Sequence, residues 1–133
     1  MWSADDGMRT VNLSGAVANA YSQSMAYFEV NGEKYYRDIM SGSMPAHQIY
    51  TFPIGTQIRF VAKAISGLSD GNKATIKFNG QDVVVKTSTK GGGEVTATYD
   101  YVLNGNMNVT ISVTVIESGT IKNAVSTITI NEQ

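Results

Sequence analysis

Short runs of alternating apolar and polar residues, separated by glycine-containing turns, constrain this chain more than any other feature. In the run 108–116, NVTISVTVI, the odd-numbered valines and isoleucine alternate with threonine and serine. Because successive side chains of a strand point to opposite faces, such a run has one buried face and one wet face. Similar runs occupy 56–64 and 94–102. We therefore predict strands that each cover one side of a core.

Six further segments share this β-branched and aromatic content, which is typical of strands. They are 24–30, 34–37, 48–51, 73–78, 82–86 and about 120–130. About nine strands at short spacing in one 133-residue chain predict an all-β domain, an immunoglobulin-like antiparallel β-sandwich, with a small β-barrel as the alternative. We place the sandwich at 24–133. Residues 1–23 are predicted to form an N-terminal arm and are a candidate attachment segment.

Three Asn-Gly pairs each follow an apolar run, namely Asn31-Gly32, Asn79-Gly80 and Asn104-Gly105. An Asn-Gly pair supplies the two positive-φ residues that a tight hairpin turn needs. Each pair is therefore predicted to join two strands that are neighbours in a sheet. In the segment FPIGT, Pro53 is expected at the second position of a turn and Gly55 at its positive-φ position.

The composition argues against several classes of function. Ten basic and eleven acidic residues give a net charge of −1 without a basic block, so nucleic-acid binding is not expected. The chain has no cysteine and no run of 18 apolar residues, so neither a disulfide framework nor membrane insertion is expected. The first ten residues lack the basic and apolar parts of a secretory signal. We therefore expect a protein made in the cytoplasm.

No set of residues has the spacing of a catalytic or metal site. His47 is the only histidine, and no acidic cluster accompanies it at ligand spacing. The segment KGGGE lacks the Gly-Lys-Ser/Thr sequence of a phosphate-binding loop and lies between predicted strands. We therefore expect no enzymatic activity, no metal and no cofactor.

The candidate contact residues are of two kinds. Tyr35 and Tyr36 are adjacent in a predicted strand and must point to opposite faces, so one of them is a candidate for contact with a glycan. The alternative for this exposed tyrosine is a surface pair with the neighbouring strand. Apolar side chains in polar or irregular segments are candidates for attachment to a partner protein. These are Trp2, Met8, Met40 and Met44.

The order of these motifs resembles the small immunoglobulin-like virion proteins of tailed bacteriophages and their prophages. The match covers about residues 25–116 and includes Val30-Asn31-Gly32, Pro53, Gly55-Thr56, Ile58, Ile76, Asn79-Gly80, Tyr99, Tyr101, Gly105-Asn106 and Val109-Ile111. The resemblance implies a non-enzymatic structural protein of the virion, either a capsid decoration or head-fibre protein or a tail or neck accessory protein. It implies attachment to the major capsid or tail protein, display in many copies with self-association as an option, and weak contact with host glycans.

Similar motifs occur in the immunoglobulin-like repeat domains of bacterial surfaces. The alternative function is therefore a carbohydrate-binding or adhesive module at the bacterial cell surface. An aromatic side chain such as Tyr35 or Tyr36 would then make the sugar contact.

Overall fold

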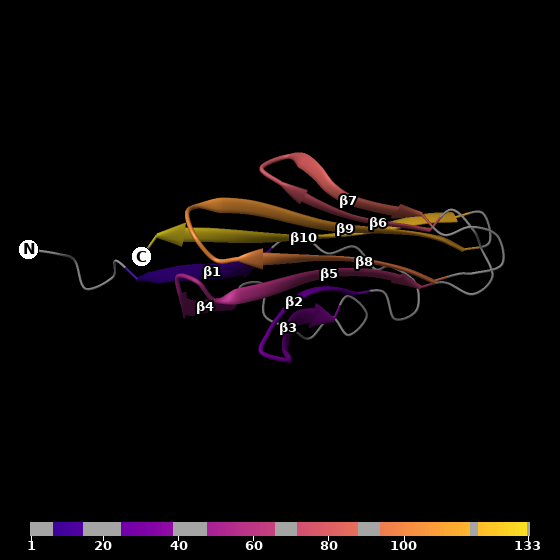
Figure 1. The fold of residues 1–133 in the computed structure, drawn as a ribbon. Coiled ribbons are helices and arrows are strands. Elements are labelled where there is room, and N and C mark those ends of the chain that lie inside the picture. Colours follow the sequence, from indigo (N-terminus) through magenta and orange to yellow (C-terminus); the bar gives the residue numbers. More distant parts are fainter. Residues whose placement is uncertain are drawn as a thin grey trace, which may run out of the picture.

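The computed structural model describes residues 7–14, 25–38, 48–65, 72–87, 94–117 and 120–132. They form ten strands: β1 (Met8–Ser14), β2 (Met25–Val30), β3 (Glu33–Asp38), β4 (Gln48–Pro53), β5 (Gln57–Ile65), β6 (Lys73–Phe78), β7 (Gln81–Thr87), β8 (Glu94–Val102), β9 (Met107–Glu117) and β10 (Thr120–Glu132). The strands make two antiparallel sheets that pack face to face (Figure 1). The predicted β-sandwich is therefore confirmed, and the described strands do not close into a barrel.

The larger sheet has six strands in the order β4-β1-β10-β9-β6-β7, and the smaller sheet has four in the order β3-β2-β5-β8. From β5 onward the connectivity is that of an immunoglobulin domain. Strands β5 and β8 take the places of B and E in one sheet, and β6, β7, β9 and β10 take those of C, C′, F and G in the other. The first four strands extend this unit, with β2 beside β5 and β3 beyond β2, and with β1 beside β10 and β4 beyond β1.

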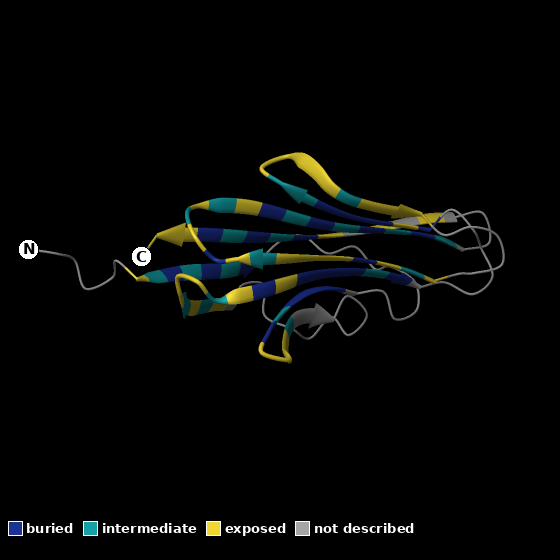
Figure 2. Ribbon diagram, in the orientation of Figure 1, coloured by how far each residue is buried: buried dark blue, intermediate teal, exposed yellow. Residues whose placement is uncertain are grey.

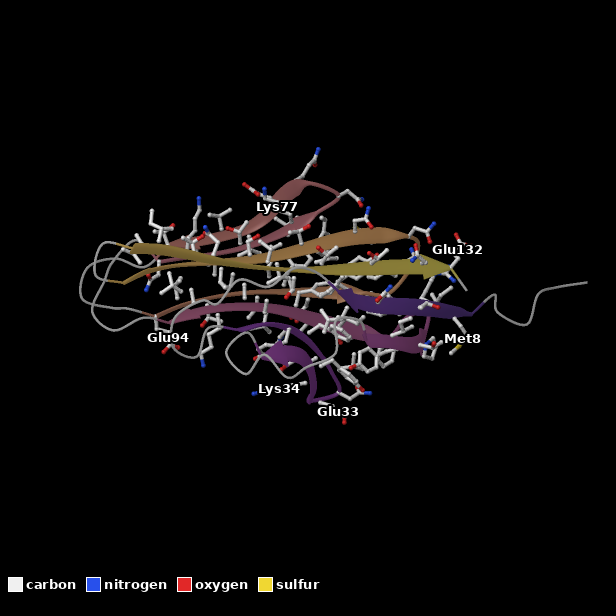
Figure 3. All side chains as sticks on the ribbon, turned by 180° about the vertical axis from the view of Figure 1, so that it is seen from behind. Met8, Glu33, Lys34, Lys77, Glu94 and Glu132 are labelled. Atoms are coloured by element: carbon white, nitrogen blue, oxygen red, sulfur yellow. The ribbon has the colours of Figure 1, made fainter. Side chains whose placement is uncertain are left out.

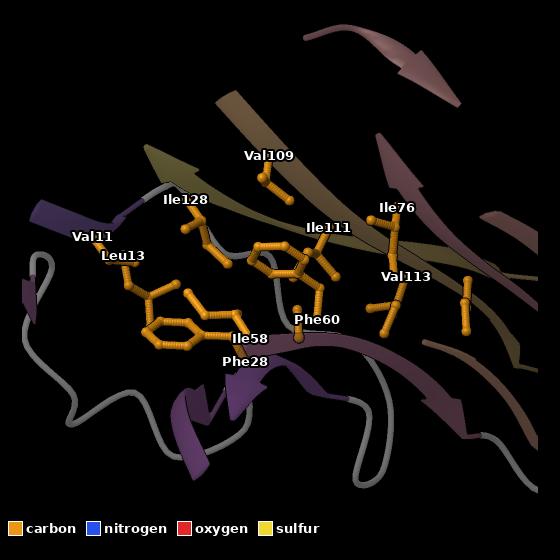
Figure 4. Close-up of a cluster of buried hydrophobic side chains, with 14 of the residues drawn as sticks. Val11, Leu13, Phe28, Ile58, Phe60, Ile76, Val109, Ile111, Val113 and Ile128 are labelled. Carbon is orange, nitrogen blue, oxygen red and sulfur yellow. The ribbon is translucent and has the colours of Figure 1, made fainter. Parts of the chain in front are cut away.

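The core lies between the sheets and follows the predicted alternation. In β9, Val109, Ile111, Val113 and Val115 are fully buried, and the intervening side chains are partly exposed. Figure 2 shows this alternation as stripes along the strands. Figure 4 shows side chains from both sheets meeting in the core, with Phe60 of β5 among them. Full burial of each large apolar side chain stabilises the fold by about 1.5–3 kcal/mol.

The prediction of an arm over residues 1–23 is wrong for Met8–Ser14. Strand β1 lies inside the larger sheet and pairs with β4 on one side and β10 on the other. Val11 and Leu13 are fully buried in the core. The period-2 signal was present in TVNL, but only two apolar residues carry it. The strand is stabilised by neighbours that are distant in sequence, which a local pattern does not reveal.

Two of the three Asn-Gly pairs form the predicted hairpin turns. Asn31 and Gly32 have φ values of 53° and 82°, and Asn79 and Gly80 have 52° and 84°. These are the left-handed conformations that a two-residue type I′ turn requires. The turns join β2 to β3 and β6 to β7.

The prediction of a third hairpin at Asn104-Gly105 is wrong. Strand β8 pairs with β5, and β9 pairs with β6 and β10, so residues 103–106 cross from the smaller sheet to the larger. Neither Asn104 nor Gly105 has a positive φ. The crossing is held by Leu103, which is fully buried and whose backbone N–H donates to the Thr56 carbonyl at 2.9 Å.

The turn after β4 differs from the prediction in one position. Gly55 has a φ of 91°, as expected. Pro53, however, is the first residue of the turn and not the second, because its carbonyl accepts the Thr56 N–H at 3.2 Å. The Thr56 hydroxyl donates to the same carbonyl at 2.7 Å.

Candidate functional site

Four strands of the larger sheet have an outer side made of hydroxyl, amide and β-branched side chains, and the outward Lys73 and Lys77 of β6 lie beside it. Register and alternating burial direct one set of side chains from β4, β1, β10 and β9 away from the core. We call this set the hydroxyl face. It consists of Met8, Thr10, Asn12, Ile49, Thr51, Pro53, Asn108, Thr110, Ser112, Thr114, Ile116, Ile121, Asn123, Val125, Thr127, Thr129 and Asn131.

The hydroxyl face contains no charged residue, although it spans four strands. Its polar side chains lie opposite one another across the strands, as Thr110 does with Thr127. The Thr114 hydroxyl donates a hydrogen bond of 2.8 Å to the Asn123 side-chain oxygen. Ile49 and Ile121 are more than 60% exposed. Such a surface can be buried against another protein without desolvating an ion, and its hydroxyl and amide groups can still form hydrogen bonds.

The outer side of the smaller sheet carries a row of charged residues instead. Glu29 on β2, Arg59 on β5 and Asp100 on β8 are opposite one another in register. The Arg59 guanidinium donates to both carboxylate oxygens of Asp100, at 2.7 and 3.3 Å, and one of its nitrogens lies 3.9 Å from Glu29. The hydrogen bonds from Arg59 lower the pKa of Asp100, and the same hydrogen bonds raise the pKa of Arg59.

This charged row lines a shallow pocket of about 280 Å³. Its other lining residues are Asn31, Gly32 and Gln57. The lining contains no aromatic ring on which a sugar could stack, and its arginine already binds Asp100. The pocket can offer polar contacts only, at a site where water competes for each of them.

Tyr35, a predicted contact residue, belongs to an aromatic cluster at one side of the sandwich. Its ring stacks on Phe28 with centroids 5.1 Å apart and meets Tyr50 and Phe52 edge-on at 4.6 and 5.7 Å. Because β3 and β4 are edge strands of different sheets, this cluster joins the two sheets along that side. We call it the aromatic seam. Each such ring pair contributes about 0.5–1.5 kcal/mol beyond its buried area.

The aromatic seam changes the acidity of its tyrosines. Burial raises the pKa of Tyr35, and the hydrogen bond that its hydroxyl donates to Glu33 at 2.9 Å raises it further. Burial also raises the pKa of Tyr50, with a smaller effect from the Glu33 charge. A second cluster at the opposite side contains Phe60, Phe78, Tyr99 and Tyr101.

The other predicted contact residues are only partly within the described structure. Met8 is half-buried on β1, opposite Pro53, at the end of the molecule where Figure 3 labels it. Trp2, Met40, Met44 and His47 lie outside the described residues, as do the three glycines of KGGGE. Tyr36 lies in β3, but its side chain is not among those described. The hydroxyl face was not predicted as a unit, although only 16% of the residues in the sequence are charged.

Comparisons with protein-family models, with curated proteins and with solved structures find no match to this chain. The class that the fold itself defines is the immunoglobulin-like sandwich. The described part of the chain has no group of three or more His, Cys, Asp or Glu that could hold a metal ion. Its secondary structure also includes no helix long and apolar enough to cross a membrane.

Proposed function

We propose that this chain is a non-enzymatic structural protein of a tailed-phage virion. It attaches an immunoglobulin-like domain to the capsid, or to the tail or neck, and its partner is the major capsid or tail protein. The observation that carries the proposal is the hydroxyl face, a four-strand surface without a charged side chain. The resemblance of the strand and turn motifs to phage virion proteins supports the same assignment.

The hydroxyl face is the docking surface in this proposal. The centres of protein interfaces are depleted of charged residues because each buried ion must be desolvated. On this face Ile49, Ile121 and Val125 are exposed and supply apolar contact area. The threonine and asparagine side chains around them hydrogen-bond to the partner. The charged row of the smaller sheet then faces solvent.

Display in many copies fits a flat surface of modest affinity. A virion presents the same partner site many times, so a domain that dissociates meets another site at high local concentration. In this proposal the protein is made in the host cytoplasm and is then incorporated into the particle. It needs no cofactor, nucleic acid or membrane for this role.

The experiment is to purify particles from cells that carry the coding sequence and to measure the chain in them. We expect quantitative mass spectrometry to find it at a fixed ratio to the major capsid or tail protein. Because the hydroxyl face is uncharged, we also expect the chain to remain bound in about 1 M salt, which screens ionic contacts. Abundant chain in the cell lysate, together with its absence from purified particles, would overturn the proposal.

The attachment role of Trp2 needs a separate deletion. Removing residues 1–10 would also remove the first residues of β1, including Arg9, whose side chain is buried. Removing residues 1–6 leaves β1 complete. If Trp2 contributes to attachment, this shorter deletion lowers the number of copies per particle, and an unchanged copy number excludes such a contribution.

A further inference from the structure

The two sheets end in four edge strands, and β4 differs from the other three. Strand β3 contains Glu33 and Lys34, β7 contains Asp82 and Lys86, and β8 contains Glu94 and Asp100. In β7 the register also shifts at a bulge opposite Ile76 and Lys77. Charged residues, bulges and proline are devices that prevent an edge strand from pairing with another chain, and of these β4 has only Pro53 at its end. Strand β4, QIYTFP, contains no charged residue and no bulge in its pairing with β1.

The backbone of β4 presents a short, defined set of hydrogen-bonding groups to the outside. The Ile54 N–H donates to the Gly7 carbonyl at 2.6 Å, on the side of β1. Because backbone N–H and C=O groups alternate sides along a strand, residues 50 and 52 also direct their N–H and C=O groups toward β1. Ile49, Thr51 and Pro53 therefore direct theirs outward. Pro53 has no N–H, and its carbonyl already accepts from Thr56, so Ile49 and Thr51 supply the outward groups.

These outward groups are self-complementary about one residue. If a second β4 pairs antiparallel with the two-fold axis at Tyr50, Ile49 of each copy lies opposite Thr51 of the other. Each such pair exchanges both N–H···O bonds, so every outward group of Ile49 and Thr51 is used. A register centred on Thr51 would instead place Ile49 opposite Pro53, which has no N–H to donate.

We propose that β4 is a self-association edge, at which two copies of this chain pair to form one continuous sheet. A two-fold contact of this kind is isologous, with the same surface on both copies. The side chains suit it: Ile49 is 63% exposed beside the outward Thr51, and β4 itself carries no charged side chain. The hydroxyl faces of the two copies then continue one another. This contact does not depend on the virion proposal, because it forms in the purified chain.

The test is sedimentation equilibrium of the purified full chain up to a concentration of about 1 mM. We expect a reversible monomer–dimer equilibrium for the wild type. Thr51→Pro removes an outward N–H and leaves the ladder to β1 complete, so it should weaken dimerisation at least tenfold. The matched control is Thr98→Pro. The Leu103 N–H donates to the Thr56 carbonyl, so Leu103 and the odd-numbered residues of β8 direct their backbone groups toward β5. The Thr98 N–H therefore points outward, as the Thr51 N–H does. This variant should dimerise like the wild type.

A second measurement does not depend on how well the proline variants fold. In the wild-type chain, amide hydrogen exchange at Ile49 and Thr51 should slow as the concentration rises, while exchange at Thr98 stays constant. A wild type that remains monomeric at every concentration would overturn the proposal. The β4 edge would then pair with a strand of another protein or with no strand. Equal loss of dimer in both proline variants, or concentration-dependent protection at Thr98 alone, would overturn it as well.

Discussion

The outer faces of the two sheets are built on the same backbone pattern but carry opposite chemistry. Across β2, β5 and β8 of the smaller sheet, a single row contains Glu29, Arg59 and Asp100. Across β4, β1, β10 and β9 of the larger sheet, no outward side chain of the described residues is charged. Both faces are polar. In the strands of both faces, outward side chains alternate with side chains that are buried in the core. The difference lies in whether the polarity comes from ions or from hydroxyl and amide groups.

This difference separates a surface that can be buried from one that favours water. Desolvating an ion costs several kcal/mol unless it is paired in good geometry, whereas a hydroxyl or amide needs only one new hydrogen-bond partner. A chain with an ordinary share of charged residues would place some of them on both faces. Here the charged share is 16%, and the outward charges of the larger sheet lie on β6 and β7, such as Lys73, Lys77 and Asp82, and not on the four strands of the hydroxyl face.

The largest expected effect comes from placing a charge on each face in turn. Val125→Lys adds a cation to the hydroxyl face, and Val102→Lys adds one to the outer side of β8. If the hydroxyl face binds the particle, an unpaired buried charge at residue 125 weakens binding by on the order of 3 kcal/mol, more than a hundredfold. The measurement is the copy number per particle for each purified variant.

Val102→Lys is the matched control, because both valines are exposed and on outward sides of strands. It should bind like the wild type. Equal losses for both variants would mean that the contrast between the faces has no role in docking. A loss for Val102→Lys alone would assign docking to the charged face.

A smaller effect is expected when one arginine of each sheet, Arg9 in the larger and Arg59 in the smaller, is replaced by methionine. Arg9 of β1 is buried, and its guanidinium donates to the Met8 carbonyl at 2.7 Å and to the Asn104 carbonyl. Arg9→Met leaves both carbonyls without these donors and should lower the free energy of unfolding by about 2 kcal/mol. Arg59 is half exposed and binds Asp100 at the surface, so Arg59→Met should shift the urea midpoint much less. A larger shift for Arg59→Met than for Arg9→Met would contradict this.

The Asn-Gly pairs show how far local sequence determines the fold. All three have the same dipeptide, and the positive-φ conformation at Asn31-Gly32 and Asn79-Gly80 follows from its chemistry. At Asn104-Gly105 the chain crosses between the sheets instead, because β8 pairs with β5 and Leu103 is buried against the turn after β4. Those partners are about forty residues back along the chain. The dipeptide indicates a change of direction but does not specify which strand follows as a neighbour.

The candidate site was less predictable than the fold for the same reason. The alternation in NVTISVTVI predicted that Thr110, Ser112 and Thr114 share one wet side of a strand, and the structure places them there. Which strands lie beside them depends on long-range pairing. The addition of β1 beside β10, and of β4 beside β1, makes the hydroxyl face broad, and the sequence pattern contained no signal for that order. A wet stripe could be predicted, but a continuous face could not.

The next prediction concerns the aromatic seam, which joins the two sheets along one side. Burial raises the pKa of Tyr35 above its ordinary value of 10.0. Above about pH 10 the unfolded chain therefore loses this phenolic proton while the folded chain keeps it, so stability falls as the pH rises. Tyr35→Phe should flatten the decrease in urea midpoint between about pH 9 and pH 11.

Glu33→Gln provides a graded comparison for this decrease. Glu33 accepts the Tyr35 hydrogen bond and adds a negative charge nearby, and both effects raise the pKa of Tyr35. The variant should therefore reduce the alkaline decrease in stability without abolishing it, since burial remains. An alkaline decrease that is the same in the wild type and in both variants would show that the seam does not hold Tyr35 in its protonated form.

The smallest effect is expected from the charged row itself, at acidic pH. Hydrogen bonds from Arg59 lower the pKa of Asp100 below its ordinary value of 3.8. The pair therefore contributes its stabilisation above that value and loses it as the pH falls through the lowered pKa of the folded state. Asp100→Asn should remove this part of the acid dependence. Because both side chains are about half exposed, the contribution is small and should shrink further in high salt.

The same variant should leave the copy number on particles unchanged, because in our proposal this face remains in solvent. A clear loss of particle binding in Asp100→Asn would place the charged row inside the interface and reverse the roles of the two faces.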